Sequence, residues 1–405
     1  MQQAPGPSGR RADIDYLRVG ALLLLIIYHV LLVYSADWWR VESTHQGPWA
    51  DYFINALTPW RMALVFAIGG MAARFMIEKM KPGAFVLERA GKLLTAFAFA
   101  VIVLIPLQRY VRMDNEHAAA VDYLDFLLLR ARYAVEENGV WLPDFANAWF
   151  LPYLFLYSAI AAFFWAFARG LIAWLQRGVE QAPVWLLALI AAVWFGFVES
   201  VVIPHNPVSG LMFPDLGGHL RFAPVFAFGL LVGKSDVFIR KLLGAKVMLW
   251  LLGAALLAAT LSMQWRMELD AAAVEPLFRD GWRVLRGAYA AAMLFGVLAF
   301  GMWAFTRQSG FMTWASDAIL PVYLMHQTVL VVVADALVPQ RLPLAAEMPI
   351  LFAATLLAPI VIYSVVVRHT SWLRVLFGLR PKPRPWPMKS QAPTPGPGIE
   401  PAHRL

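Results

Sequence analysis

Ten mainly apolar stretches alternate with polar segments along the chain. A helix needs about 20 residues to cross the ~30 Å hydrocarbon core of a bilayer, and most of these stretches are close to that length. The pattern therefore predicts an all-α, polytopic membrane protein with about ten transmembrane helices. The predicted spans are 17–35, 58–77, 91–107, 149–168, 183–203, 218–233, 246–264, 284–305, 315–338 and 347–367.

The polar segments between the spans alternate in charge. Basic residues gather before the first span, after every second span and in the tail, whereas the other segments lean acidic. Cytoplasmic loops carry the excess of Lys and Arg in membrane proteins, so both termini are predicted to be cytoplasmic. We expect a cytoplasmic N-terminal segment (1–16), a transmembrane domain (17–370) and a Pro-rich, largely disordered cytoplasmic tail (371–405). An amphipathic pattern at 121–135 predicts an interfacial helix in a long outer loop.

Composition agrees with a membrane protein and excludes several kinds of chemistry. The chain is 60% hydrophobic and 15% charged, whereas a soluble domain has roughly 25% charged residues. The net charge of +8 fits the basic loops and gives no reason to expect a nucleic-acid partner. The chain has no cysteine, which excludes disulfides, thiol nucleophiles and Cys-ligated metals. The outer-loop histidines lack the i,i+4 spacing of a metal-binding helix, so no metal site is predicted.

The first span holds two ionisable residues on one helix face. Arg18 opens the apolar run, and His29 follows eleven residues later. Eleven steps of ~100° return to within ~20° of the start, and eleven rises of ~1.5 Å cover roughly 16 Å. With Arg18 at the cytoplasmic surface, His29 is predicted near mid-membrane, where a titratable group indicates a functional site. The alternative is a histidine that is hydrogen-bonded inside a helix bundle.

Two further basic residues are predicted on the cytoplasmic side. Arg89 and Lys92 lie at the start of the third span, and their i,i+3 spacing puts them on one helix face. Together with Arg18 they suit a phosphorylated cytoplasmic ligand, because guanidinium groups match the oxygens of a phosphate. The alternative is the ordinary basic bias of cytoplasmic loops.

A second intramembrane histidine, His326, lies in the ninth span, about 15 Å from its cytoplasmic start. Two histidines at matching depth on different helices suggest a shared polar cavity, and Pro321 can kink the helix nearby. A hydrogen-bonded bundle histidine is again the alternative.

Three further charged residues, Arg61, Arg221 and Glu199, lie near the outer ends of other spans. They either line an acceptor cleft or are explained by snorkelling or mutual ion pairing.

These residues belong to four ordered motifs, within about 13–370, that resemble the family-3 membrane acyltransferases. The family pattern has a basic residue and a His separated by ten residues, a basic pair before the third helix, a Trp-Phe-Leu, and a Tyr-Leu-x-His. The matching residues here are Arg18 and His29, Arg89 and Lys92, Trp149-Phe150-Leu151, and Tyr323 to His326. The chain is similar to the branch that includes the C-type proteins of glucan biosynthesis, and we expect the stand-alone form, without an appended periplasmic domain.

The resemblance implies transfer of an acetyl or succinyl group from cytoplasmic acyl-CoA to a hydroxyl of an envelope glycan outside the bacterial inner membrane. Arg18, Arg89 and Lys92 would then bind the CoA phosphates. His29 would act as general base or covalent acyl relay, and His326 would orient the acceptor or stabilise the oxyanion. The expected partners are acyl-CoA, the glycan and the lipid bilayer, and no permanently bound cofactor is expected.

Three positions depart from the family pattern. Gly69 stands where the family often has Ser, and Asn147 stands where a His often precedes the Trp-Phe-Leu motif. Lys92 replaces the commoner Arg, which gives up bidentate phosphate contacts. These departures concern the details of donor and acceptor binding more than the class of reaction.

Two other functions fit the same residues. A transporter or flippase of a lipid-linked sugar or another anionic solute would use the histidines as a proton relay and would not consume acyl-CoA. A structural subunit of an envelope-glycan complex would tolerate the loss of both histidines.

Overall fold

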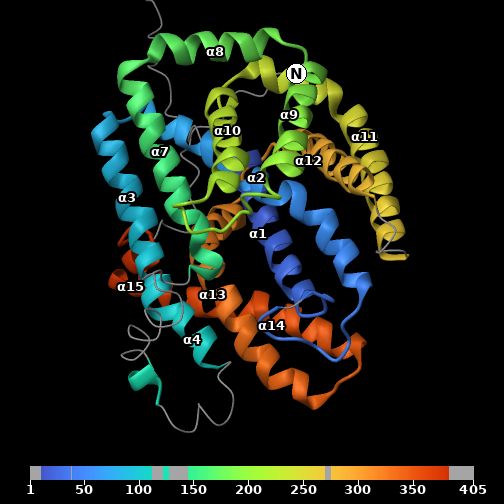
Figure 1. Ribbon diagram of the computed structural model, residues 1–405. Coiled ribbons are helices and arrows are strands. Elements are labelled where there is room, and N and C mark those ends of the chain that lie inside the picture. The colour runs from blue at the N-terminus through green and yellow to red at the C-terminus, as the bar shows by residue number, and fades with distance from the viewer. Residues whose placement is uncertain (1–10, 38, 112–121, 127–144, 270–274, 383–405) are drawn as a thin grey trace, which may run out of the picture.

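The computed structural model describes residues 11–37, 39–111, 122–126, 145–269 and 275–382 (Figure 1). These residues form a bundle of helices and contain no strand. The principal helices are α1 (Ala12–Leu32), α2 (Pro48–Ile77), α3 (Pro82–Phe99), α7 (Phe150–Phe167), α8 (Arg169–Gln181), α9 (Val184–Phe197), α10 (Leu216–Val232), α11 (Asp236–Leu269), α12 (Pro276–Ala304), α13 (Gly310–Leu337) and α14 (Leu344–Val365). Shorter elements are the π-helical turns η1 (Ala100–Leu104) and η3 (Val198–Val202), the 3-10 turns η2 (Ala146–Trp149), η4 (Val338–Gln340) and η5 (Val367–His369), and the helices α4 (Ile105–Tyr110) and α15 (Ser371–Leu376).

The prediction of an all-α, polytopic membrane protein is confirmed. Within the described ranges, nine helices are long and apolar enough to cross a membrane, rather than ten. The predicted span 218–233 corresponds to α10, whose 17 residues are at the short end of the range that crosses a bilayer. Other helices extend past their predicted spans, because the hydropathy pattern stops at charged residues that the helix still includes. For example, α11 begins at Asp236 rather than at 246.

Two predictions about polar segments fall largely outside the described residues. The interfacial helix predicted at 121–135 is described only over 122–126, and the predicted tail is described only up to 382. The first part of that tail forms α15, where Arg374 is 2% exposed. Its Nε atom donates a hydrogen bond to the carbonyl oxygen of Arg380 at 2.8 Å. This part of the predicted tail is therefore folded and packed.

Helices α1 and α2 contribute to two apolar clusters that fill the two halves of the bundle. One cluster contains Ile26 of α1 and Phe66 of α2 together with residues of α3, α7, α13 and α14. The other contains Ala21 of α1 and Leu64 of α2 together with residues of α9, α10, α11 and α12. Side chains that project from α1 and α2 can therefore meet residues from both halves.

Helix α8 crosses one end of the bundle, at the top of Figure 1, and we call this the α8 end. The sequence pattern places 169–182 in a loop, because Arg169 and Arg177 interrupt the apolar run. The structure shows an amphipathic helix instead. Its Ile172 is buried against the bundle, whereas Trp174 on the outer face is 64% exposed.

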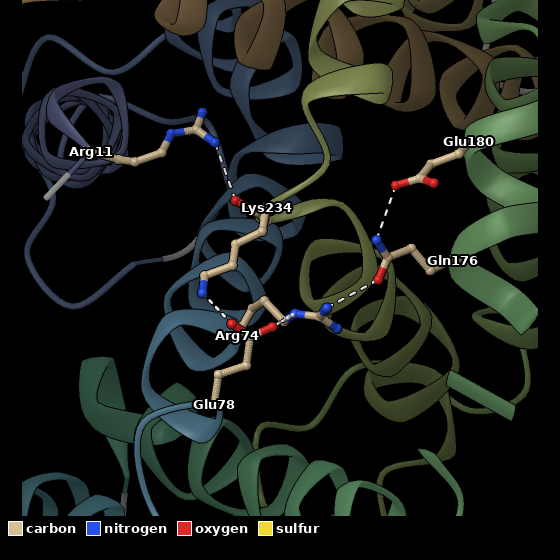
Figure 2. Close-up of polar contacts among 7 residues, drawn as sticks. Arg11, Arg74, Glu78, Gln176, Glu180 and Lys234 are labelled. Atoms are coloured by element: carbon tan, nitrogen blue, oxygen red, sulfur yellow. Dashed lines mark hydrogen bonds and ion pairs between the residues drawn. The ribbon is translucent and has the colours of Figure 1, made fainter. Parts of the chain in front are cut away.

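Polar contacts tie four chain segments together at the α8 end (Figure 2). They join the start of α1, the end of α2, helix α8 and the turn between α10 and α11. The contacts are Arg11–Gly233, Lys234–Glu78, Glu78–Arg74, Arg74–Gln176 and Gln176–Glu180. The Arg11 and Gln176 contacts are hydrogen bonds of 3.0–3.1 Å, and the Arg74–Glu78 ion pair measures 2.7 Å. This network fixes how these helix ends lie relative to one another.

Helices α2 and α10 cross at two glycines. A Cβ atom at Gly70 would lie 2.0 Å from the carbonyl oxygen of Phe226, and one at Gly229 would lie 2.1 Å from that of Ala67. The two backbones are therefore in direct contact, which only glycine permits at these positions.

Candidate functional site

Two histidines from different helices face each other inside the bundle. His29 lies in the last turn of α1, and His326 lies within α13. The Nε2 atom of His326 is 3.4 Å from Nδ1 of His29, and the ring centroids are 4.9 Å apart. His326 is 0% exposed and His29 is 9% exposed. The packing of α1 against α13 thus brings together the two histidines that the sequence pattern singles out.

Backbone carbonyls set the tautomer of each histidine ring. Nδ1 of His29 donates a hydrogen bond to the carbonyl oxygen of Leu25 at 2.9 Å, and Nδ1 of His326 donates to that of Tyr323. In a neutral imidazole the other nitrogen then carries a lone pair and no proton. Nε2 of His326 faces the Nδ1–H group of His29. Nε2 of His29 makes no hydrogen bond within the described part of the chain, and it can accept a proton.

The backbone beside His326 is held by Asn147, at the position where the family pattern often has a histidine. The Tyr323 hydroxyl donates to the backbone carbonyl of Asn147, and the Asn147 amide donates to the backbone carbonyl of Tyr323 at 3.2 Å. Asn147 is 7% exposed. This residue therefore fixes the segment that carries His326, and within the described residues it makes no hydrogen bond to either imidazole.

The three basic residues predicted to bind phosphate lie on α1 and α3. Arg89 is buried, and its Nε donates to the Ser158 hydroxyl of α7 at 3.1 Å. Lys92 is exposed, and Arg18 is partly exposed, with its Nη1 atom 3.8 Å from the Asp15 carboxylate. The charges of Arg18 and Arg89 both act on the Lys92 ammonium group. These three residues, which we call the basic cluster, are therefore within range of one another's charge, although they differ in exposure.

A buried ion pair occupies another part of the bundle. Nη1 of Arg221 is 2.5 Å from Oε1 of Glu199, and Nη2 of Arg221 donates to the carbonyl oxygen of Pro59 at 3.0 Å. Glu199 lies in the π-helical turn η3, and Nη1 of Arg286 is 4.0 Å from its other oxygen. Mutual ion pairing, one of the two explanations considered for these residues, therefore applies to Arg221 and Glu199.

Arg61 is arranged differently from Arg221. Its Cζ atom lies over the ring of Tyr28, 3.5 Å from the centroid, and the residue is 6% exposed. Within the described ranges, its Nε and Nη1 atoms have no hydrogen-bond partner, and the ion pairs found there do not include Arg61. Its charge acts on both His29 and His326. A buried cation with free N–H groups therefore lies beside the histidine pair.

Tyr28 and Arg286 are members of this region that the sequence pattern does not single out. Arg286 is a charged residue at the start of an otherwise apolar span, and that signal could have identified it. Tyr28 is an aromatic residue within an apolar run, so the sequence gives no indication of its contact with Arg61.

Two of the outer-loop histidines in the described part, His219 and His45, have structural partners, and the third, His205, is exposed. His219 accepts a hydrogen bond from the Tyr157 hydroxyl at 3.0 Å and donates one to the carbonyl oxygen of Met212 at 2.8 Å. His45 donates to the carbonyl oxygen of Leu342 at 2.8 Å. Across the described residues, no group of three or more His, Asp or Glu side chains is placed to hold a metal ion.

Comparison with known proteins finds relatives over most of the chain. The family described as the acyltransferase domain, family 3, matches residues 11–368. The glucans biosynthesis protein C of Shigella dysenteriae serotype 1 (strain Sd197) is 22% identical over 341 residues, which cover 80% of this chain and 82% of that protein. The protein of the same name from Escherichia coli (strain K12) has the same identity and coverage. No solved structure gives a significant match.

Proposed function

Because the chain belongs to the acyltransferase-3 family and is therefore a membrane acyltransferase, we propose that it transfers an acyl group from acyl-CoA to a hydroxyl of a cell-envelope glycan. In this proposal the donor is acetyl-CoA or succinyl-CoA. The membrane is the bacterial inner membrane, both termini lie in the cytoplasm, and the α8 end of the bundle faces the cytoplasm.

The histidine pair is the observation that most supports the proposal. With its Nδ1–H group held by the Leu25 carbonyl, His29 has Nε2 free to take the proton of an attacking hydroxyl. The acceptor oxygen then attacks the thioester carbon, and the carbonyl electron pair moves onto its oxygen. Collapse of this intermediate expels the CoA thiolate, which takes the proton back from His29. His326 orients His29 by facing its Nδ1–H group.

The basic cluster supports acyl-CoA as the donor. CoA carries several phosphate oxygens, and Arg18, Arg89 and Lys92 offer cationic donors from α1 and α3. The ion pair of Arg89 with a phosphate would add to its hydrogen bond with Ser158. The alternating loop charges support a cytoplasmic position for this cluster, on the side where acyl-CoA is made.

The names of the relatives support a glucan as the acceptor. They are glucans biosynthesis proteins, and this chain aligns with them over 80% of its length. We therefore propose an envelope glucan, or a glycan with similar free hydroxyls, on the side of the membrane opposite the basic cluster.

Acyl transfer by the purified protein in liposomes tests this function. Radiolabelled acetyl-CoA and succinyl-CoA are supplied on the side of the α8 end, and a periplasmic glucan is supplied on the other side. Wild-type protein should label the glucan. His29→Ala should lower the rate at least ~10²-fold, as expected for a lost general base. His326→Ala should also lower it, by a smaller factor.

Two results would contradict the proposal. Wild-type protein that moves glucan or another solute across the bilayer without consuming acyl-CoA would be a flippase or a transporter. Folded His29→Ala protein that transfers acyl groups at the wild-type rate would show that the histidine pair is structural. A melting profile matched to wild type is the control for folding.

A further inference from the structure

With the tautomers described above, neither histidine can stabilise the oxyanion that forms during acyl transfer. Attack on a thioester places negative charge on the former carbonyl oxygen, and enzymes stabilise this oxyanion with aligned N–H donors. His326 uses its one N–H group on the Tyr323 carbonyl, and its Nε2 atom faces the N–H of His29. A neutral His326 therefore has no proton to offer the oxyanion.

Arg61 has the free donors that His326 lacks. Its Nε and Nη1 atoms are buried and make no hydrogen bond within the described residues. Burying a guanidinium without an ionic partner carries a large desolvation cost, so such an arrangement points to a compensating role. The neighbouring Arg221 shows the contrast, because it is neutralised by Glu199 at 2.5 Å.

The position of Arg61 fits a role in the reaction. Its Cζ atom lies over the ring of Tyr28, the residue that precedes His29, and the rings of Tyr28 and His29 have centroids 5.4 Å apart. The contact with the ring does not occupy the Nε–H and Nη1–H groups, which make no hydrogen bond within the described residues. The charge of Arg61 reaches both imidazoles. A thioester that is attacked next to His29 would therefore develop its negative charge close to Arg61.

We propose that Arg61 is the oxyanion-stabilising residue of this acyltransferase and that Tyr28 positions it. The proposal rests on the proposed function. As the acceptor hydroxyl gives its proton to His29 and bonds to the thioester carbon, the carbonyl oxygen gains an electron pair and accepts hydrogen bonds from Arg61. The oxyanion then reforms the carbonyl, and the carbon–sulfur bond breaks to release CoA. Arg61 remains protonated throughout.

Steady-state kinetics of Arg61 variants in the liposome assay test this role. An interaction made only in the transition state lowers kcat and leaves KM nearly unchanged. Arg61→Met should therefore lower kcat by ~10²–10³-fold, the usual effect of losing an oxyanion donor, with KM for acyl-CoA within about threefold of wild type. Arg61→Lys keeps the charge and should retain more activity than Arg61→Met. Tyr28→Leu should lower kcat more than Tyr28→Phe, because phenylalanine preserves the stacking.

Added methylguanidinium provides a readout that a purely structural role would not change. It should restore part of kcat in Arg61→Ala and leave His29→Ala unchanged. Arg283→Met is the matched control, because it removes a partly exposed guanidinium of α12 that pairs with Asp280 at 2.8 Å. It should match wild type in both kcat and KM.

The outcomes separate this inference from the function on which it rests. If wild-type protein transfers no acyl group, the proposed function fails and this inference fails with it. If wild type is active, any one of three results overturns the role of Arg61 alone. These are a kcat of Arg61→Met within threefold of wild type, a loss that appears mainly in KM, and an Arg61→Ala variant that methylguanidinium does not rescue. If Arg61→Met does not fold, Arg61→Lys is compared with wild type, and Tyr28→Leu is compared with Tyr28→Phe. The changes in kcat and KM then decide in the same way.

Discussion

Substituting Gly229 by alanine tests how closely α2 and α10 must approach. The new Cβ atom would lie 2.1 Å from the carbonyl oxygen of Ala67, whereas ordinary contact begins at 3.4 Å. The backbones must therefore separate by about 1.3 Å at this point. Overpacking of this kind costs typically ~1–3 kcal/mol, because neighbouring side chains lose contacts when the helices move apart. Gly229→Ala should be destabilised by that amount.

Gly70 provides a second and coupled test of the same crossing. A Cβ atom there would lie 2.0 Å from the carbonyl oxygen of Phe226, so Gly70→Ala should have a similar cost. One separation of the helices relieves both clashes. The double variant should therefore be less destabilised than the sum of the single variants, as expected for neighbouring sites that share a displacement.

Thermal unfolding in a single detergent, followed by tryptophan fluorescence, measures these effects. Gly20→Ala is the matched control, because a Cβ atom at Gly20 of α1 meets nothing within 4 Å. Gly229→Ala should unfold at least ~2 °C below this control. Its activity should fall as well, since Arg221 of α10 donates to the Pro59 carbonyl of α2 at 3.0 Å and the helix shift strains that bond. Equal unfolding midpoints for Gly229→Ala and Gly20→Ala would refute the close crossing.

Three further predictions concern donor binding, sidedness and pH. Arg89→Ala should weaken acyl-CoA binding, measured by isothermal titration, by ~1.5–3 kcal/mol, because a charged hydrogen bond is lost. Unchanged affinity would mean that the basic cluster only determines membrane topology. Reporter fusions after Lys241 should read as cytoplasmic and fusions after Leu269 as periplasmic, and the opposite result would invert the proposed orientation. Hydrogen bonds from Ser235 and Gln176 lower the pKa of Glu180 below its usual value, so this carboxylate stabilises the fold above its unfolded pKa and loses that effect as pH falls through the lowered value. The unfolding midpoint should consequently drop on acidification below about pH 4.5, and the drop should be smaller in Glu180→Gln.

Hydropathy was sufficient to predict most of the fold, because a helix that crosses a bilayer must be apolar over a nearly fixed length. It was insufficient for α8, since a helix that lies across one end of a bundle needs only one buried stripe. A search for helical periodicity would have detected Ile172 and its neighbours as such a stripe. It was also insufficient for α15, which is short and basic and is held by the buried Arg374.

The candidate site was predictable only in part. A histidine inside an apolar run is costly and therefore conspicuous, which is why His29 and His326 could be paired from depth alone. The depth argument also identified Arg61, but it could not distinguish Arg61 from Arg221. The two arginines differ only in the residue that each one contacts. Glu199 reaches Arg221 from a π-helical turn, and Tyr28 offers Arg61 an aromatic face. Both contacts depend on how the helices rotate in the bundle, and a single sequence carries no signal for that rotation.

Each histidine of the pair takes its tautomer from its own helix. Leu25 lies four residues before His29, and Tyr323 lies three residues before His326. The carbonyl that accepts the Nδ1–H hydrogen bond is therefore on the same helix as its ring and moves with it. Sliding or tilting of α1 against α13 then changes the 3.4 Å gap between the rings and leaves the protonation pattern of each ring intact. Each ring therefore keeps its tautomer whether or not the two rings are in contact. Helix motion alone can join or separate them during a catalytic cycle, and no proton has to be redistributed when they meet again.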